Sequence, residues 1–148
     1  MTATMRRARN EDLAAIVAML ADDVLGQSRE VPGDPAYAEA FAAMERDPNQ
    51  FPAVLEDSGE VVGYLQLTFI PGLSLKGMLR GQIESVRIAS SRRGQGLGHV
   101  LLTWAIAECR RRGCGLVQLA MNKSREDTLR FYKSLGFVAS HEGFKLSL

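Results

Sequence analysis

The stretch QIESVRIASSRRGQGLG, residues 82–98, decides the fold of this chain. Its first part, residues 82–89, alternates as a β-strand does, in which side chains two apart lie on one face. Its second part, residues 90–98, contains three glycines, which permit backbone conformations closed to other residues. A helical pattern of apolar residues follows and ends at Gly113. The sequence therefore predicts a strand, a glycine-rich turn and a helix in direct succession.

Periodicity and turn residues predict the rest of the secondary structure. Strands are expected at residues 4–9, 51–56, 61–70, 116–121, 137–140 and 143–148, the last two as a hairpin, and further helices at residues 10–24, 34–46 and 124–135. We expect Asn10 to cap the first helix through its side-chain oxygen, and Asp34 to cap the second ahead of Pro35. This order is typical of an α/β domain around one central sheet, and residues 1–148 are expected to form a single domain.

Composition excludes several classes of function. Lys and Arg total 18 against 17 Asp and Glu, so the chain has no global field for nucleic acid or an anionic membrane. No apolar run approaches the roughly 20 residues that span a bilayer, and the first ten residues do not resemble a signal peptide. Two cysteines, Cys109 and Cys114, make neither a disulfide framework nor a zinc site. We therefore expect a cytoplasmic protein with reduced thiols, no metal, and no nucleic-acid or membrane partner.

The glycine-rich turn has the properties of an anion site. Glycines let a ligand approach the main chain closely, and N–H groups converge at a helix N-terminus, where the dipole favours negative charge. Arg92 and Arg93 add positive charge at the same place. A P-loop would continue as Gly-Lys-Ser/Thr, but this turn continues Gly98-His99, and the glycine spacing differs from the dinucleotide fingerprint. The turn instead fits the pattern Gln/Arg-x-x-Gly-x-Gly/Ala, with Arg93 as its first residue.

Two motifs together make the chain resemble the GNAT superfamily of acetyltransferases. The first is the strand and turn from Ile83 to Gly98, and the second is RFYKSLGF, residues 130–137, which is similar to that family's Tyr-x-x-x-Gly-Phe signature. The resemblance implies a mostly antiparallel sheet whose fourth and fifth strands, here residues 82–89 and 116–121, splay apart to admit acetyl-CoA. It also implies that the main chain of the fourth strand pairs with the pantetheine arm, as in strand addition.

The resemblance assigns the cofactor contacts residue by residue. In this chain they are Val86, Arg87, Ile88, Arg93, Gly94, Gln95, Gly96, Leu97, Gly98, His99 and Asn122. The main-chain N–H near Val86 would polarise the thioester carbonyl. The chain departs from the family where many members carry Asn, because Arg125 stands there, and Thr128 replaces a usual Ala. Asn122, close by, is the remaining candidate for that amide contact.

Transfer to an amine needs a neutral nucleophile and an acid for the departing thiolate. Tyr132 matches the family's tyrosine, and a phenol is close enough in acidity to a thiol to protonate it. The alternative is that Tyr132 is a core aromatic beside Phe131. Glu84 is the candidate base, on the strand face shared with Val86 and Ile88 by period two. The alternative for Glu84 is a salt bridge to Arg80 or Arg87, or anchoring of the acceptor.

The sequence says less about the acceptor of the acetyl group than about its donor. In the resembling family it binds near the first two helices and the adjoining loops, where the polar candidates are Arg29, Glu30, Tyr37 and Arg80. We expect a small-molecule primary amine, and a homodimer is compatible with the sequence. Acetylation of a protein N-terminus or lysine remains an alternative. So does a non-catalytic domain that binds or senses acyl-CoA, whereas a nucleotide-dependent enzyme is disfavoured by the missing P-loop residues.

Overall fold

The computed structural model describes residues 3–148. Their contacts divide the chain into two compact units, Met1–Gln118 and Leu119–Leu148. The elements, in chain order, are β1 (Thr4–Arg7), α1 (Leu13–Ala21), α2 (Ala36–Arg46), β2 (Gln50–Asp57), β3 (Glu60–Ile70), the single turn α3 (Ser74–Gly77), β4 (Arg80–Ile88), α4 (Leu97–Arg111), β5 (Leu116–Leu119) and α5 (Glu126–Ser134). None of the helices in this part of the chain is long and apolar enough to cross a membrane.

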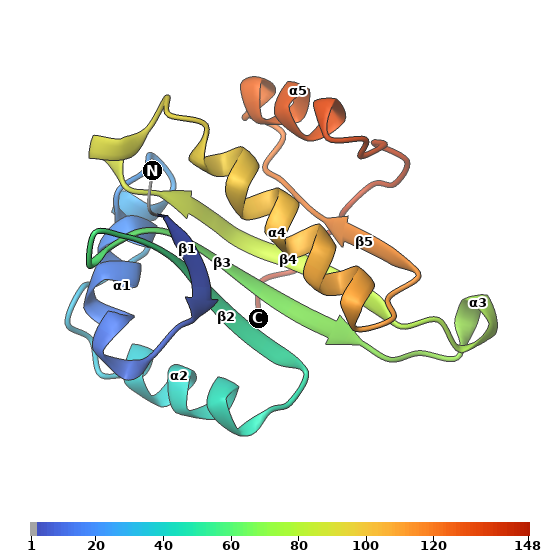
Figure 1. Ribbon diagram of the computed structural model, residues 1–148, viewed down its shortest axis with the longest axis horizontal. Coiled ribbons are helices and arrows are strands. Elements are labelled where there is room, and N and C mark those ends of the chain that lie inside the picture. The colour runs from blue at the N-terminus through green and yellow to red at the C-terminus, as the bar shows by residue number, and fades with distance from the viewer. Residues whose placement is uncertain (1–2) are drawn as a thin grey trace. The chain divides into compact units, whose positions relative to one another are not determined.

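The five strands form one mixed sheet in the order β1-β2-β3-β4-β5 (Figure 1). Neighbouring strands from β1 to β4 are antiparallel, and β5 runs parallel to β4. The hairpin between β2 and β3 closes through Ser58 and Gly59, both with positive φ, as the twist of a tight hairpin requires. The predicted fold class, a mixed α/β fold with helices flanking a mostly antiparallel sheet, is confirmed.

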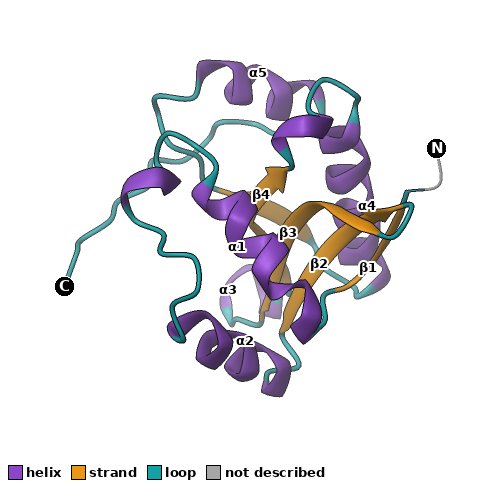
Figure 2. Ribbon diagram, turned by 90° about the vertical axis from the view of Figure 1, so that its left-hand side faces the viewer, coloured by secondary structure: helices purple, strands orange, loops and turns teal. Residues whose placement is uncertain are grey.

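Helices cover both faces of this sheet (Figure 2). On one face, α1 and α2 pack on a buried cluster that includes Ile16, Phe41, Val54 and Tyr64. On the other face, α4 buries a stripe at helical spacing, comprising Leu97, Leu101, Leu102, Ala105 and Cys109. Alternation along β2 and β3 supplies both layers, because successive side chains point to opposite faces.

A β-bulge interrupts β4. Its register against β3 pairs Tyr64 with Arg87 and Gln66 with Glu84, so two residues of β4 lie opposite one residue of β3. Ser85, within the bulge, has φ 57°, in the left-handed region that residues other than glycine rarely occupy. An irregularity of this kind re-aims the side chains on either side of it.

The bulge overturns the expectation that Glu84 shares a face with Val86 and Ile88. One extra residue shifts the period-two pattern, so each side chain beyond it changes face. Ile88 packs near Gly63 and Leu101, on the α4 face. Glu84 lies on the opposite face, with α1 and α2, and is exposed there.

The first helix begins differently from the prediction. Asn10 lies in a short 3-10 turn and is not the cap; instead Asp12 accepts a hydrogen bond from the Arg9 N–H at 2.7 Å. Asp12 is also held by both Nη atoms of Arg6, at 2.7 and 2.9 Å, which ties β1 to the start of α1. In the second helix the expected cap is confirmed, since Asp34 Oδ1 accepts from the Ala36 N–H at 2.8 Å.

The predicted C-terminal hairpin is wrong, because residues 137–148 form no strand. An isolated two-stranded hairpin is marginal without an apolar face to pack on. The side chains that would supply such a face are exposed, with Val138 at 81% and Phe144 at 93%. In this second unit, α5 is instead followed by a turn at Gly136, which has φ 95°.

Candidate functional site

The glycine-rich turn presents an open backbone at the start of α4. Gly94 and Gly96 have φ of 77° and 76°, a conformation that favours glycine strongly over any residue with a Cβ. A side chain at either position would meet nothing within 4 Å, so the surface above both glycines is free for a ligand. Leu97, 1% exposed, anchors the turn to the core immediately afterwards.

The helix that follows supplies unpaired donors. Within α4 the first amide to bond inside the helix is that of Val100, which donates to the Gly96 carbonyl at 3.3 Å. The amides of Leu97, Gly98 and His99 precede it, at the end of the helix where amides lack acceptors in the preceding turn. Together with the dipole of a 15-residue helix, they suit a diphosphate group.

Two arginines join the turn to neighbouring segments through hydrogen bonds. Arg92 Nη2 lies 2.5 Å from Asp57 Oδ2 in the β2–β3 hairpin, and Arg92 Nε donates to Gln95 Oε1 at 3.1 Å. Arg93 Nη2 donates to the Asp22 carbonyl at 3.1 Å, with the Asp22 carboxylate 3.8 Å away. Both guanidinium groups therefore have carboxylate neighbours, and the open main chain is the immediate donor surface.

The main chain of β4 faces outward beside this turn. Ala89 N–H donates to the Val62 carbonyl of β3 at 2.9 Å. Residues of an antiparallel pair alternate between peptide groups that face the partner and groups that face away. Ile88, next to Ala89, therefore turns its peptide group away from β3. Val86 lies in the bulge, where this alternation is interrupted. The Val86 carbonyl accepts from Arg87 Nη1 at 2.9 Å, and Arg87 also pairs with Asp23 at 3.2 Å.

A small pocket opens on the face that carries Glu84. Its volume is about 140 Å³, and it lies between α1, α2 and the strands β3 and β4. The lining is mostly apolar, with polar atoms from Tyr37, Tyr64, Gln66 and Ser85. An apolar pocket with a few converging polar groups is typical of a small-molecule site.

Glu84 stands at the edge of this pocket. It pairs in register with Gln66, which lines the pocket, and its charge acts on Tyr64, another lining residue. Burial, and secondarily the Glu84 carboxylate, raises the pKa of Tyr64 to about 12. Tyr64 is therefore a neutral hydroxyl at any physiological pH, next to a carboxylate that can accept a proton.

Three of the four predicted acceptor residues contact one another, and one of them, Tyr37, lines the pocket. Tyr37 OH donates to Glu30 Oε1 at 3.0 Å and accepts from the Val31 N–H at 2.8 Å. Arg29 Nε lies 3.4 Å from Glu30 Oε2. The fourth, Arg80, is not part of this group; it donates to Gln118 Oε1 of β5 at 3.1 Å.

The second unit holds the other two predicted residues. Tyr132 is 9% exposed, and its ring packs edge-on against Phe131 and Phe137, at centroid distances of 5.4 and 5.8 Å. Asn122 Oδ1 accepts from the Ser124 N–H and hydroxyl, at 3.0 and 2.7 Å, in the turn that precedes α5. The Asn122 amide nitrogen remains a donor beyond this turn.

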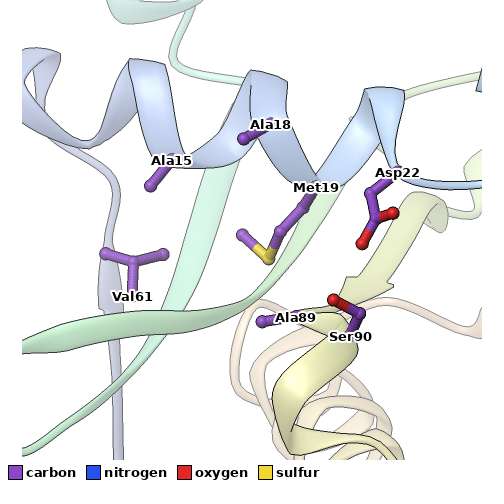
Figure 3. A pocket seen from close by; sticks show the side chains of 7 residues that line it. All are labelled: Ala15, Ala18, Met19, Asp22, Val61, Ala89 and Ser90. Atoms are coloured by element: carbon purple, nitrogen blue, oxygen red, sulfur yellow. The ribbon is translucent and has the colours of Figure 1, made fainter. Parts of the chain in front are cut away.

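A second pocket, of about 280 Å³, lies between α1 and the end of β4 (Figure 3). Apart from Asp22 and Ser90, its lining is apolar, contributed by Ala15, Ala18, Met19, Val61 and Ala89. The oxygen atoms of Asp22 and Ser90 lie at one end of it, and Val61 lies at the other. Neither Glu84 nor Tyr132 lines either pocket. The smaller pocket is the better candidate for the acceptor, because it is lined by the predicted acceptor residue Tyr37 and by Gln66, the cross-strand partner of Glu84.

Sequence reasoning missed the side chains that surround Glu84. Tyr64, Gln66, Gln82, Ser85 and Gln118 belong to the pocket or to its polar edge. The sequence does carry a signal for some of them, since polar residues at 66, 68, 82 and 84 alternate with apolar ones on two adjacent predicted strands. That pattern marks one face as polar, although it does not reveal which residues meet.

Comparisons with known proteins agree with this geometry. Residues 13–137 match the acetyltransferase (GNAT) family. The chain is 32% identical over 144 residues to the aminoalkylphosphonate N-acetyltransferase of Salmonella typhimurium, covering 97% of this chain and 90% of that protein. It is 36% identical over 93 residues to the glucosamine 6-phosphate N-acetyltransferase of Trypanosoma brucei brucei, covering 63% and 61%. A transcriptional regulator from Bacillus halodurans C-125 has a solved structure that matches with a TM-score of 0.95, at 47% identity and 99% coverage of each chain.

Proposed function

Because this chain belongs to the GNAT family of acetyltransferases, we propose that it transfers an acetyl group from acetyl-CoA to a primary amine of a small molecule, with both bound at once. Its relatives are named N-acetyltransferases, and the chain is an acyltransferase of that type. The observation that carries the proposal is the open glycine turn, Gly94–Gly96, at the N-terminus of α4. We also propose that residues 1–148 act together as one catalytic domain.

The donor half of the site rests on backbone groups. Proteins of this family use acetyl-CoA, which supplies the acetyl group as a thioester. The amides from Gly94 to His99 would hold its diphosphate, and peptide groups of β4 at Val86 and Ile88 would pair with its pantetheine arm. The open space above both glycines fits this role, because a Cβ there would occupy the approach to the main chain.

The acceptor half rests on Glu84 and the 140 Å³ pocket beside it. Glu84 would accept a proton from the ammonium form of the acceptor, directly or through one water molecule, and so leave the amine lone pair free to attack. The bond between that nitrogen and the acetyl carbon forms as the carbon–sulfur bond breaks, and the nitrogen then releases its second proton, which balances the proton that the thiolate takes up. Tyr64, held neutral by its raised pKa, would orient the amine or the water as a hydrogen-bond donor.

The sulfur leaves as a thiolate and needs a proton. Tyr132 is the proposed donor, and Asn122 the proposed amide contact to the cofactor. Support for Tyr132 comes from its match to the family's Tyr-x-x-x-Gly-Phe signature. Its aromatic neighbours, Phe131 and Phe137, fix the direction of its ring within α5.

The acceptor class follows from the relatives and the pocket volume. The Salmonella relative is named for an aminoalkylphosphonate and the trypanosomal one for an amino sugar phosphate, so both act on small amines that carry a phosphorus oxyanion. A pocket of about 140 Å³ accommodates a molecule of a few heavy atoms. We therefore propose a small amine with an anionic group as the acceptor, with Tyr37 in the pocket lining to contact it and Arg29 linked to Tyr37 through Glu30.

An acceptor screen tests this function. Purified protein and acetyl-CoA are incubated with aminoalkylphosphonates, amino sugar phosphates, amino acids, polyamines and a peptide, while thiol release is followed with a chromogenic reagent. We expect acceptor-dependent release of coenzyme A for a small anionic amine, with acetylated product by mass spectrometry. Tight binding of acetyl-CoA without release for any acceptor would contradict transfer and support acyl-CoA sensing, and release only with the peptide would identify a protein acetyltransferase.

A further inference from the structure

A hydrogen-bonded series of four polar side chains runs along the face of the sheet that carries Glu84 and ends on Glu84. Arg80 Nη1 donates to Gln118 Oε1 at 3.1 Å, and Gln118 Nε2 donates to Gln82 Oε1 at 2.7 Å. Gln82 Nε2 then donates to Glu84 Oε1 at 2.9 Å. Three members belong to β4, and Gln118 reaches them from β5, so the chain spans the boundary between the two strands.

The direction of every hydrogen bond in the chain is determined by its two ends. A guanidinium group only donates, so Gln118 must turn its carbonyl oxygen to Arg80 and its amide nitrogen to Gln82. An ionised carboxylate only accepts, so Gln82 must turn its nitrogen to Glu84. Each of the two glutamines has one oxygen and one nitrogen, and this arrangement is the one that satisfies both ends at once. The amide dipoles therefore align from the cation of Arg80 to the anion of Glu84.

We propose that Arg80, Gln118 and Gln82 are positioning residues that hold Glu84 as the proton acceptor, an inference that rests on the base role proposed above for Glu84. Gln82 donates a hydrogen bond to Oε1 of Glu84, and among the described residues no hydrogen bond reaches Oε2. Oε2 is therefore the oxygen available to the acceptor. Without these hydrogen bonds, an exposed glutamate samples several rotamers, which include ones that take the carboxylate away from the pocket edge.

The alignment also explains why Arg80 does not sit with the other predicted acceptor residues. Arg80 is joined to Glu84 through the amides of Gln118 and Gln82 and not through a direct ion pair, so Arg80 does not occupy Oε2. A direct contact between Arg80 and Glu84 would occupy the carboxylate and oppose its protonation.

The test uses variants that remove hydrogen bonds between Arg80 and Glu84 at a distance from the pocket. Gln118→Met removes two hydrogen bonds at nearly constant volume, and Arg80→Met removes the cation at the far end. We expect kcat to fall roughly tenfold in Gln118→Met, as the loss of one or two hydrogen bonds to a charged network predicts, with the Kd of acetyl-CoA unchanged. Arg80→Lys keeps a donor and should recover most of the activity that Arg80→Met loses.

A control and a double variant separate positioning from general damage. Thr68→Val, opposite Gln82 on β3, removes a side-chain hydrogen bond to Gln50 Oε1 at 2.9 Å without removing any of the three hydrogen bonds that lead to Glu84, and should leave kcat unchanged. In the Glu84→Gln background, Gln118→Met should cause little further loss, because the two act through one group. Normal kcat in Gln118→Met, or losses that simply add in the double variant, would overturn the inference while leaving Glu84 as the base. If Glu84→Gln alone has normal kcat, the proposed base is wrong and the positioning role fails with it.

Discussion

Tyr64 and Glu84 share one face of the sheet, on adjacent strands, and a bulge separates Glu84 from the face of Ile88, which the sequence pattern predicts it to share. Burial of the Tyr64 hydroxyl, together with the charge of the exposed Glu84 carboxylate, raises the pKa of Tyr64 to about 12. The pair joins a neutral donor to an acceptor at the edge of a small pocket. The proposed chemistry depends on this arrangement.

The titration of Tyr64 is directly measurable. The chain has three tyrosines, and ultraviolet absorbance of phenolate should show one of them ionising near pH 12 instead of near its ordinary pKa of 10.0. Tyr64→Phe should remove that late step, and Glu84→Gln should move it to lower pH, because a nearby negative charge is lost. A late step that persists in Tyr64→Phe would contradict the assignment.

The raised pKa of Tyr64 also sets a limit on alkaline stability. The unfolded chain releases this proton near pH 10 and the folded chain near pH 12, so the unfolded state binds fewer protons between these values. The stability that the neutral hydroxyl provides is therefore fully present below pH 10 and is lost as pH rises toward 12. Tyr64→Phe should lose less stability across that interval in denaturant titrations at matched pH.

A β-carbon at Gly96 should weaken the binding of acetyl-CoA. Gly96→Ala must hold φ near 76° with a side chain over the open main chain, so we expect the Kd to rise at least tenfold. Gly113→Ala is the matched control, because Gly113 has φ 84° and equally open surroundings at the far end of the same helix. Thermal unfolding should show similar losses of stability in both variants, and calorimetric titration should show loss of affinity in Gly96→Ala alone. Equal affinities would contradict the assignment of the turn.

Asp12 should control stability in acid. The hydrogen bond from Arg6, opposed in part by burial, lowers the pKa of Asp12 below its ordinary value of 3.8. Its stabilisation is therefore present above pH 3.8 and is lost as pH falls through the lower folded value. Asp12→Asn should cost about 2 kcal/mol at neutral pH, as the loss of charge-assisted hydrogen bonds predicts, and should flatten the acid dependence. Glu11→Gln, an exposed neighbour, should change stability by less than about 0.5 kcal/mol, and an equal effect of both substitutions would refute the role of Asp12.

The backbone of Ser85, which lines the pocket, has a strained conformation. Ser85→Gly should stabilise the protein by about 1 kcal/mol, because glycine adopts the φ of 57° without steric cost. Ser58→Gly offers a comparison, since Ser58 has φ 53° in a hairpin turn remote from the pocket. Urea denaturation should show a gain in both variants. A loss in Ser85→Gly alone would mean that the hydroxyl contributes more than the strain costs.

Most of the fold could be predicted from local patterns. The strand–turn–helix around residues 82–98 was readable because glycine spacing and apolar periodicity are local properties. The cap at Asp34 was readable for the same reason, since it bonds two residues away. Asn10 was a wrong cap because Arg6, on the neighbouring strand, selects Asp12 instead.

The site was less accessible to sequence reasoning for two physical reasons. Strict alternation assumes an unbroken ladder, and the extra residue at Ser85 moves Glu84 to the other face. The contact of Gln118 with Gln82 joins residues 36 positions apart, which depends on how β4 and β5 pair. The prediction of a C-terminal hairpin was wrong for a related reason. Alternation at residues 137–148 does not specify a partner on which the two strands could pack.

The most direct measurement compares kcat of the wild type and Glu84→Gln across pH, with the best acceptor from the screen and saturating acetyl-CoA. Glu60→Gln, on the exposed first residue of β3, is the control for loss of one carboxylate. We predict that Glu84→Gln lowers kcat by about a hundredfold, as removal of a general base does, abolishes the acid limb of the pH–rate profile and leaves the Kd of acetyl-CoA unchanged. An unchanged kcat and an unchanged pH–rate profile would contradict the central claim that Glu84 accepts the proton of the attacking amine.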